Sequence, residues 1–421
     1  MSDSPPSWSQ MWRVFGQIGL LSFGGPAAQI GLMHRELVDR RAWLNEADYL
    51  RALSFCMLLP GPEAMQLATY AGWRLRGVRG GLLAGLLFVL PGAALILTLA
   101  AAYVRWGQLP LVAALFIGVK AAVVVIVIEA LLRVAWRALK GRIQWAIAGL
   151  ALAGIFLLNL AFPLLILVAA LAGAMLLAPA TATPPQPATS RSGAGHLLPT
   201  LAFGGALWAA PLALAWGMDQ RFLLQVGLFF SKLALVTFGG AYAVLAYMTQ
   251  AVVQSFGWLD TAQMMDALGL AETTPGPLIL VTTFVAFLAG HGQAGWGTAL
   301  LAGLMSLWVT FVPCFLWIFA FAPYIEAIAH RPRLQGALSG ISAAVVGVIA
   351  SLGLWFALRV LFANVSEWTF GPLALPIPSG ANIASMVIMA VAAWLLLVRH
   401  TNLFAVLGLS AGLGLLSTLV A

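Results

Sequence analysis

The sequence predicts an all-α polytopic membrane protein made of two repeated halves with inverted topology. Each half is expected to hold broken, re-entrant half-helices followed by two long transmembrane helices. The chain is 62% hydrophobic and only 8% charged, whereas a soluble domain is about 25% charged. Its Gly, Pro and Trp landmarks recur at one constant offset in the second half. The alternating ten-residue segments of a membrane β-barrel are not seen.

The repeat is clearest in three motifs. Between residues 15 and 62, about a third of positions are identical to the matched position in the second half. The identities concentrate on helix breakers rather than on common apolar residues, which indicates internal duplication. The motifs Phe23-Gly24-Gly25, Trp43-Leu44 and Pro60-Gly61-Pro62 return as Phe238-Gly239-Gly240, Trp258-Leu259 and Pro275-Gly276-Pro277.

The N-terminal half, 1–178, is predicted to have a core over 12–142 and a helical hairpin over 143–178. The core starts with an apolar segment interrupted at Gly24-Gly25 and then runs through a polar loop to the Pro-Gly-Pro motif. The apolar runs 80–104 and 109–132 are long enough to cross about 30 Å of hydrocarbon as helices.

Residues 179–198 are rich in Pro, Ala, Thr and Ser and are predicted to be a polar linker. The C-terminal half, 199–421, is expected to contain a linking helix over 199–217, a core over 222–362 and terminal helices over 380–420. In the later part of the repeat Gly81 and Pro91 match Gly303 and Pro313. The separation between these matched residues is seven residues larger than that of the first three motifs. A seven-residue gap between the copies is therefore predicted near the loop at 74–79. Together the halves give about nine full spans and four re-entrant segments.

Charges in matched loops predict the inversion. The loops 34–51, 74–79 and 133–142 hold eleven Lys and Arg, while their counterparts in the second half hold only Arg359. In a fourth pair of loops the bias is reversed, with Arg331 and Arg333 against Arg105. Basic loops stay cytoplasmic, so the halves are expected to have opposite orientation. If 34–51 and 74–79 lie on one side, the Pro-Gly-Pro segment between them is re-entrant.

The broken segments are the predicted substrate site. Irregular backbone at membrane depth persists only against protein or a wet cavity, and paired helix breakers in two halves are typical of transporter sites. A half-helix that starts at Pro62 or Pro277 leaves free N–H groups that attract anions. The expected substrate-binding residues are therefore Gly24, Gly25, Pro60, Gly61, Pro62, Gly239, Gly240, Pro275, Gly276 and Pro277. A packing role is preferred for Gly81, Gly85, Gly336 and Gly340.

A helix with an N-terminal cap is expected before each Pro-Gly-Pro turn. Asn45 with Asp48, and Asp260 with Gln263, have the spacing of N-terminal capping pairs.

Two lysines in apolar runs, Lys120 and Lys232, are candidates to balance a bound anion, because an ionisable group inside a membrane is usually functional. For Lys232, snorkelling to the interface is an equal alternative. Glu129 precedes Arg133 by one helical turn, which favours a structural helical ion pair.

Glu63 and Glu272 flank the two Pro-Gly-Pro turns and are the candidates for proton coupling. Glu63 alternatively complements a helix dipole. A desolvated Glu272 would favour its protonated form.

These motifs together resemble the chromate ion transporter family in its long, two-domain form. The resemblance extends to His34-x-Glu36-x-x-x-Arg40-Arg41-x-Trp43, Gln66-Leu67-Ala68 and Thr274-Pro275-Gly276-Pro277. Gln66 and Thr274 join the expected substrate-binding residues on this ground. Family members commonly carry Gln three residues before each Pro-Gly-Pro, where this chain has Met57 and Glu272.

The resemblance implies export of chromate across the bacterial inner membrane, driven by the proton-motive force and giving chromate resistance. Sulfate is the expected competitor, and a transporter or passive channel for another anion such as sulfate is the alternative. The expected partners are chromate, protons and the lipid bilayer, with a homodimer left open and no nucleic acid. No catalytic residue, metal or cofactor is expected, because the 13 acidic residues are scattered. Cys56 and Cys314 are expected to be free and buried.

Overall fold

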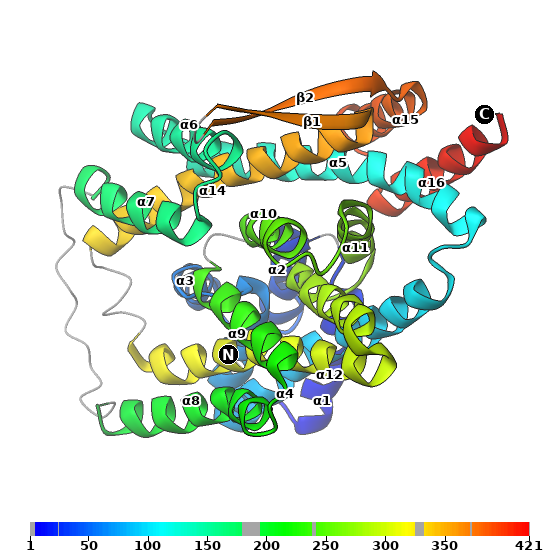
Figure 1. Ribbon diagram of the computed structural model, residues 1–421. Coiled ribbons are helices and arrows are strands. Elements are labelled where there is room, and N and C mark those ends of the chain that lie inside the picture. The colour runs from blue at the N-terminus through cyan, green and yellow to red at the C-terminus, as the bar shows by residue number, and fades with distance from the viewer. Residues whose placement is uncertain are drawn as a thin grey trace. The chain divides into compact units, whose positions relative to one another are not determined.

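The computed structural model describes residues 5–23, 25–178, 194–237, 241–324, 332–370 and 373–420, and these are mostly helical (Figure 1). The chain forms two compact units. Unit 1 comprises Met1–Ala101, Thr181–Ala241 and Leu270–Arg331, and unit 2 comprises Ala102–Ala180, Tyr242–Gly269 and Pro332–Ala421. Each compact unit therefore draws on both sequence halves.

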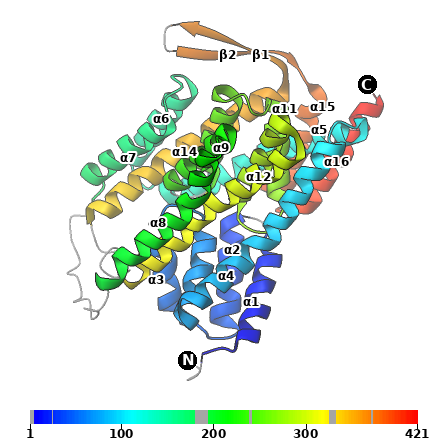
Figure 2. The same cartoon turned by 60° about the horizontal axis from the view of Figure 1, so that its bottom comes forward.

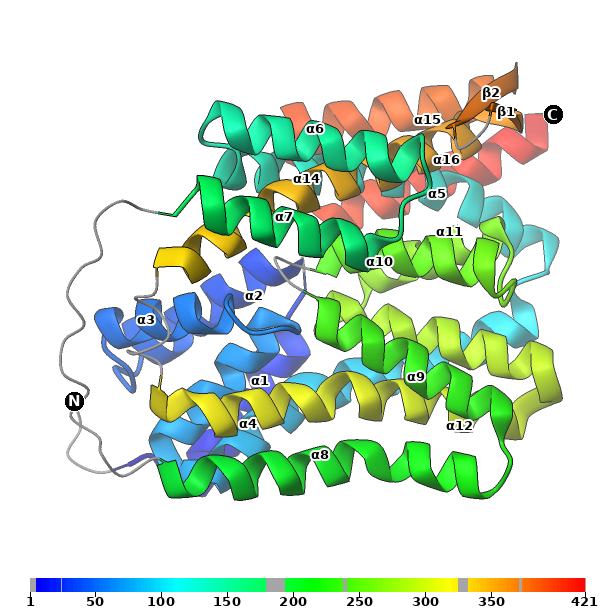
Figure 3. The ribbon, with the colours of Figure 1, turned by 60° about the vertical axis from the view of Figure 1, so that its left-hand side comes forward.

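Unit 1 holds most of the broken segments. Helix α12 packs against α8 and α9, and Figures 2 and 3 both show α1 to α4 side by side. Its main helices are α1 (Trp8–Leu21), α2 (Gly25–His34), α3 (Glu46–Cys56), α4 (Glu63–Trp106), α8 (Ala194–Gly217), α9 (Arg221–Val236) and α12 (Val281–Phe321). Short turns of π-helix (Arg35–Asp39) and 3-10 helix (Leu278–Leu280 and Ala322–Tyr324) complete it.

Unit 2 is organised around one long helix, α14 (Pro332–Leu361), which packs against α5, α6 and α7. Small residues make this packing close, since a Cβ on Gly340 would lie 2.2 Å from the Ala169 carbonyl oxygen. The other helices are α5 (Pro110–Ala138), α6 (Arg142–Phe156), α7 (Phe162–Leu176), α10 (Ala241–Gln250), α11 (Thr261–Thr273), α15 (Ile383–Ala393) and α16 (Leu403–Val420). Turns of π-helix follow α10 (Ala251–Ser255) and α15 (Trp394–Val398).

A β-hairpin in unit 2 is an element that the sequence analysis did not predict. Strands β1 (Phe362–Phe370) and β2 (Leu373–Ala381) pair antiparallel, from Phe362 opposite Ala381 to Phe370 opposite Leu373. The Ala374 N–H donates to the Leu157 carbonyl at 2.8 Å, which ties the hairpin to the turn after α6. Prolines in β2 fit a strand whose outer edge needs no ladder donors.

The repeat is visible in the backbone. Helix α4 reverses at Arg76 and Gly77, and its two arms pack so closely that a Cβ on Gly72 would lie 2.2 Å from the Gly80 carbonyl oxygen. Helix α12 reverses in the same way at Ala294 and Gly295, with φ values of −153° and 78° against −143° and 63° in α4.

The position of the reversals corrects the predicted gap between the copies. The sequence separation of Gly77 and Gly295 is three residues larger than that of Gly61 and Gly276. Only part of the seven-residue gap can therefore lie in the loop at 74–79. Three of its residues match the extra 3-10 turn Leu278–Leu280. The insertion is therefore divided between the start of α12 and a point beyond the reversal.

Hydropathy supports a multi-pass membrane protein. Within the described residues, five helices are long and apolar enough to cross a membrane: Glu63–Trp106, Pro110–Ala138, His196–Gly217, Leu278–Tyr324 and Pro332–Leu361. Four shorter apolar helices are Arg142–Phe156, Phe162–Leu176, Ile383–Val398 and Leu403–Leu419. The number of spans stays a prediction. Cys56 and Cys314 are free and buried, as predicted.

The packing of α14 against α7 gives a direct test. Gly340→Val should lower the free energy of unfolding by about 1–3 kcal/mol, because overpacking forces backbone or side chains to shift. Gly149→Val is the matched control, since no atom lies within 4 Å of a Cβ built at Gly149. Chemical unfolding in detergent measures both variants, and an equal loss in the two would contradict close packing at Gly340.

Candidate functional site

The first Pro-Gly-Pro turn joins α3 to α4. Helix α3 starts at the predicted cap, where the Asp48 N–H donates to Asn45 Oδ1 at 2.7 Å. Gly61 has a φ of 123°, a conformation that only glycine adopts without strain. Its N–H donates to the Thr237 carbonyl at 2.8 Å, directly before the second Phe-Gly-Gly motif. The first turn is thus bonded to the second half.

The second Pro-Gly-Pro turn makes the reciprocal contact. The predicted cap of α11 forms, with the Gln263 N–H donating to Asp260 Oδ1 at 2.7 Å. Gly276 has a φ of 90°, and its N–H donates to the Ser22 carbonyl at 2.8 Å, next to the first Phe-Gly-Gly motif. Gln29 adds a side-chain bond, from Nε2 to the Gly276 carbonyl at 2.7 Å.

The four turns are therefore bonded in two crossed pairs inside unit 1. We call the segments Ser22–Gly25, Pro60–Pro62, Thr237–Gly240 and Pro275–Pro277 the crossed turns. Gly25 has a φ of 77° and opens α2, whereas Gly24, Gly239 and Gly240 lie outside the described residues. The crossed bonds support the expected convergence of the turns. What the turns bind stays a prediction.

Each Pro-Gly-Pro turn also packs against a long helix of the other half. A Cβ on Gly61 would lie 2.8 Å from Cys314 Sγ in α12, and a Cβ on Gly92 in α4 would lie 2.2 Å from the Pro275 carbonyl oxygen. Backbone and side chain are therefore in close contact around both turns. Any larger residue at Gly61 would meet both this contact and an unfavourable φ.

The helices start slightly later than predicted. Pro62 precedes α4 and accepts a bond from the Gln66 N–H at 3.1 Å, so it caps the helix instead of occupying its first position. After Pro277 the chain makes the 3-10 turn Leu278–Leu280 before α12 begins. The N-terminal end of each helix is still next to the Pro-Gly-Pro turn that precedes it.

Gln66 is the polar side chain that the structure places on the first turn. It is fully buried, and its Nε2 donates to the Pro60 carbonyl at 2.8 Å. Its Oε1 has no hydrogen-bond partner among the described residues. A buried amide oxygen without a partner is costly, so Gln66 is suited to accept a bond from a water or a protonated ligand.

The two candidate carboxylates differ in their setting. Glu63 lies in the first turn of α4, where a negative charge complements the helix dipole. Glu272 is buried in α11, as expected for a desolvated group. Its repeat mate Met57 is 55% exposed, so the two positions have diverged in environment as well as in chemistry. Thr274 is buried and donates from Oγ1 to the Ala271 carbonyl at 3.0 Å.

Lys120 has a partner that the sequence analysis missed. Its Nζ lies 3.1 Å from Oδ1 of Asp266, a buried carboxylate in α11, and the Tyr103 hydroxyl donates to Oδ2 of the same carboxylate at 2.7 Å. All three residues belong to unit 2, whereas the crossed turns belong to unit 1. The charge of Lys120 is therefore balanced by Asp266. An acidic residue within the apolar sequence of α11 was the available signal.

Lys120 also borders a cavity of about 290 Å³ in unit 2. Polar lining comes from Thr261, Asn382, Ser385 and Arg359. The lysine thus faces open space while it is ion-paired.

Lys232 lies on an exposed, mostly apolar face of α9. Its side chain is exposed on α9, on the same helical face as Leu228 and Leu235, which are 54% and 42% exposed. This placement favours snorkelling to the membrane interface over a contact with the crossed turns.

The basic loop before α3 has a structural role. Glu36 is buried and is bound by Arg40, with an N–O distance of 2.5 Å, and by Arg41. Arg41 lies over the Trp43 ring at 6.0 Å. In the second copy Phe256 stacks on Trp258 at 4.4 Å instead. The motif is therefore explained by packing in this loop.

His34, the last residue of α2, lies between two carboxylates. Its Nε2 lies 2.6 Å from Glu46, and its Nδ1 lies 3.4 Å from Asp39. The hydrogen bond to Glu46 raises the pKa of His34 above its ordinary value. The predicted pair of Glu129 and Arg133 also forms.

A double-mutant cycle tests the ion pair in unit 2. Lys120→Met should lower the free energy of unfolding by about 3–5 kcal/mol, because it leaves the buried Asp266 carboxylate unpaired. Asp266→Asn should lower it less, because the Lys120 side chain is 22% exposed and borders a cavity. The double variant should recover most of this loss. Chemical unfolding in detergent gives all four corners of the cycle. Additive losses would show that the two side chains do not depend on each other.

Comparison with known proteins gives a consistent result. The family model described as "Chromate transporter" matches residues 9–174 and 224–415. The chromate transport protein of Pseudomonas aeruginosa is 34% identical over 377 residues, covering 87% of this chain and 85% of that protein. The chromate transport protein of Cupriavidus metallidurans is 32% identical over 355 residues, covering 83% of this chain and 82% of that protein. A probable chromate transport protein of Synechococcus elongatus is 31% identical over 396 residues, covering 90% and 94%.

No solved structure matches the chain significantly. The family model spans both halves of the sequence, including the loops and turns described above, and the three relatives cover 83–90% of the chain. The chain therefore belongs to the chromate transporter family.

Proposed function

We propose that this protein exports chromate from the bacterial cytoplasm across the inner membrane, that the proton-motive force drives export, and that export gives chromate resistance. The observation that carries the proposal is the crossed turns, in which Gly61 bonds to Thr237 and Gly276 bonds to Ser22. Broken helices placed symmetrically in two halves are a recurring form of transporter binding site. Relatives named as chromate transport proteins supply the substrate.

The substrate site in this proposal is formed by backbone as well as side chains. Helix starts at Glu63 and Leu278 direct N–H groups and the positive end of the helix dipole toward the turns. A tetrahedral dianion would accept bonds from such groups without a counter-charge on every oxygen. Gln66 and Thr274 would line this site, as would the glycines of the two Phe-Gly-Gly motifs.

Opposite orientation of the two halves is part of the proposal. The loop 34–51 holds four Arg, while the matched segment 249–266 holds none, and the positive-inside rule then inverts the second copy. The contacts of the crossed turns are reciprocal between the halves, so the copies are related by a two-fold pseudo-symmetry, and the loop charges are the observation that favours its inverted form. The four broken segments would be re-entrant, and the protein would act as a transporter with no enzymatic step.

Another anion such as sulfate is the alternative substrate, carried by active transport or by a passive channel. It is favoured by one observation, the buried Glu272 beside the second turn. A carboxylate at this point repels a dianion unless it is protonated, so Glu272 would either carry the coupled proton or change the anion.

Everted vesicles from cells that express the protein test export directly. Imposing a proton gradient should drive accumulation of labelled chromate above its external concentration, with excess sulfate as competitor. Vesicles that only dissipate a chromate gradient would indicate a channel. Vesicles that behave like empty controls under both conditions would refute the transport of chromate.

Replacing Glu272 tests proton coupling. Glu272→Gln should keep transport but flatten its pH dependence, because the neutral amide removes one titrating group from the transport cycle. Glu63→Gln is the comparison, since Glu63 is the other coupling candidate. Initial rates over a range of pH measure both variants. A Glu272→Gln profile that follows the wild-type profile would remove Glu272 from the coupling scheme.

A further inference from the structure

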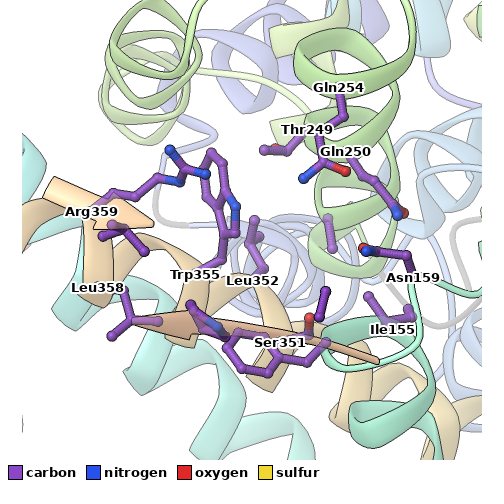
Figure 4. Close-up of a pocket in the computed structure, with 15 residues that line it drawn as sticks. Ile155, Asn159, Thr249, Gln250, Gln254, Ser351, Leu352, Trp355, Leu358 and Arg359 are labelled. Atoms are coloured by element: carbon purple, nitrogen blue, oxygen red, sulfur yellow. The ribbon is translucent and has the colours of Figure 1, made fainter. Parts of the chain in front are cut away.

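A second cavity in unit 2 has the chemistry of an anion site. It has a volume of about 80 Å³, several times the roughly 10–15 Å³ that one water molecule requires. The cavity lies among α10, α14, the turn between α6 and α7, and the β-hairpin (Figure 4). Val365, Ala374 and Pro376 of the hairpin line one side.

One cation borders this space. Arg359, in the last turn of α14, lines the cavity, and its Cζ lies 4.5 Å from the centre of the Trp355 ring. The cation–π contact holds the planar guanidinium in a fixed orientation. Figure 4 shows Arg359 and Trp355 together at one side of the cavity. No acidic side chain is among the described residues that line it.

Neutral polar groups of α10 line the same cavity. Thr249 is 3% exposed, and its Oγ1 has no hydrogen-bond partner among the described residues. Gln250 follows it, and Figure 4 shows the Gln250 side chain pointing toward Asn159. Ser351 adds a buried hydroxyl from α14. Hydroxyl and amide groups with one guanidinium are the donors that bind oxyanions, and the buried Thr249 hydroxyl lacks a partner that such a ligand would supply.

The position of Arg359 at the end of a helix has a simpler explanation, because a cation there complements the helix dipole. That explanation accounts for the charge alone. It does not account for a cavity whose polar lining faces the arginine, or for the unpartnered buried hydroxyl of Thr249.

We propose that unit 2 binds one small tetrahedral oxyanion, of the sulfate or chromate class, between Arg359 and the polar residues Thr249, Gln250 and Ser351. This site is separate from the crossed turns and would hold a second anion per chain. The proposal rests on the proposed function only for the choice of anion.

Equilibrium binding of labelled sulfate to the purified full-length protein in detergent tests this site without measuring transport. Arg359→Gln should weaken binding at the second site at least tenfold and lower the stoichiometry by one anion per chain. Arg359→Lys keeps the charge but loses the bidentate donors, so it should bind more weakly than wild type and more tightly than Arg359→Gln.

Arg399→Gln is the matched control. Arg399 lies over Trp394 at 5.3 Å, which is a similar arginine–tryptophan pair outside the cavity, so this variant should bind as the wild type does. Gln250→Leu removes a lining amide without touching the arginine and should also weaken binding, which covers the case in which Arg359→Gln fails to fold. Unchanged affinity and stoichiometry in the folded variants would overturn the proposal.

The two proposals fail separately. Loss of chromate accumulation in vesicles, with sulfate binding still sensitive to Arg359, would refute export and keep the second site. Normal accumulation, with binding insensitive to Arg359 and Gln250, would refute the second site and keep export.

Discussion

The fold depends on the need to pair backbone groups where helices break inside an apolar protein. A continuous helix satisfies its own N–H and C=O groups, but a turn at membrane depth cannot. Here the donors of Gly61 and Gly276 find their acceptors in the opposite half, at Thr237 and Ser22. These two bonds join the repeats at the points where each repeat is irregular. The same need explains why Gly and Pro, rather than apolar residues, are shared between the copies.

The reversals in α4 and α12 extend this symmetry beyond the turns. Gly85 in α4 meets Phe315 and Thr69, and Gly303 in α12 meets Leu97 and Phe287. These residues match in pairs at the same offset as the two reversals: Gly85 with Gly303, Thr69 with Phe287 and Leu97 with Phe315. The contacts thus pair Gly303 with Gly85 rather than with Gly81, the match that the sequence analysis gave. The contacts are therefore reciprocal in sequence as well as in space. Unit 1 is stabilised by the crossed hydrogen bonds and by helix contacts between the copies. Unit 2 is organised around α14 and the ion pair of Lys120 with Asp266.

Much of this architecture was predictable from the sequence because its signals are local. The capping pairs at Asn45 and Asp260 depend on residues three positions apart, and the broken helices depend on Gly and Pro themselves. The partner of Lys120 was not predictable in this way. Asp266 lies in another helix of the other sequence half, and no local pattern specifies that pairing. The β-hairpin was missed because Pro376 and Pro378 interrupt the pattern of β2, and proline within a run argues against a strand. The crossed bonds were missed because only convergence of the turns followed from the repeat.

The crossed bonds also constrain how the chain is made. Ribosomes synthesise about 5–20 residues per second, so Thr237 follows Gly61 by roughly ten to thirty seconds. During this interval the first broken segment has no native acceptor for its Gly61 donor. The nascent first half must therefore keep that turn hydrated, or shielded by the insertion machinery, until the second half enters the bilayer. Biogenesis of this protein is a delayed assembly, completed only when its second repeat arrives.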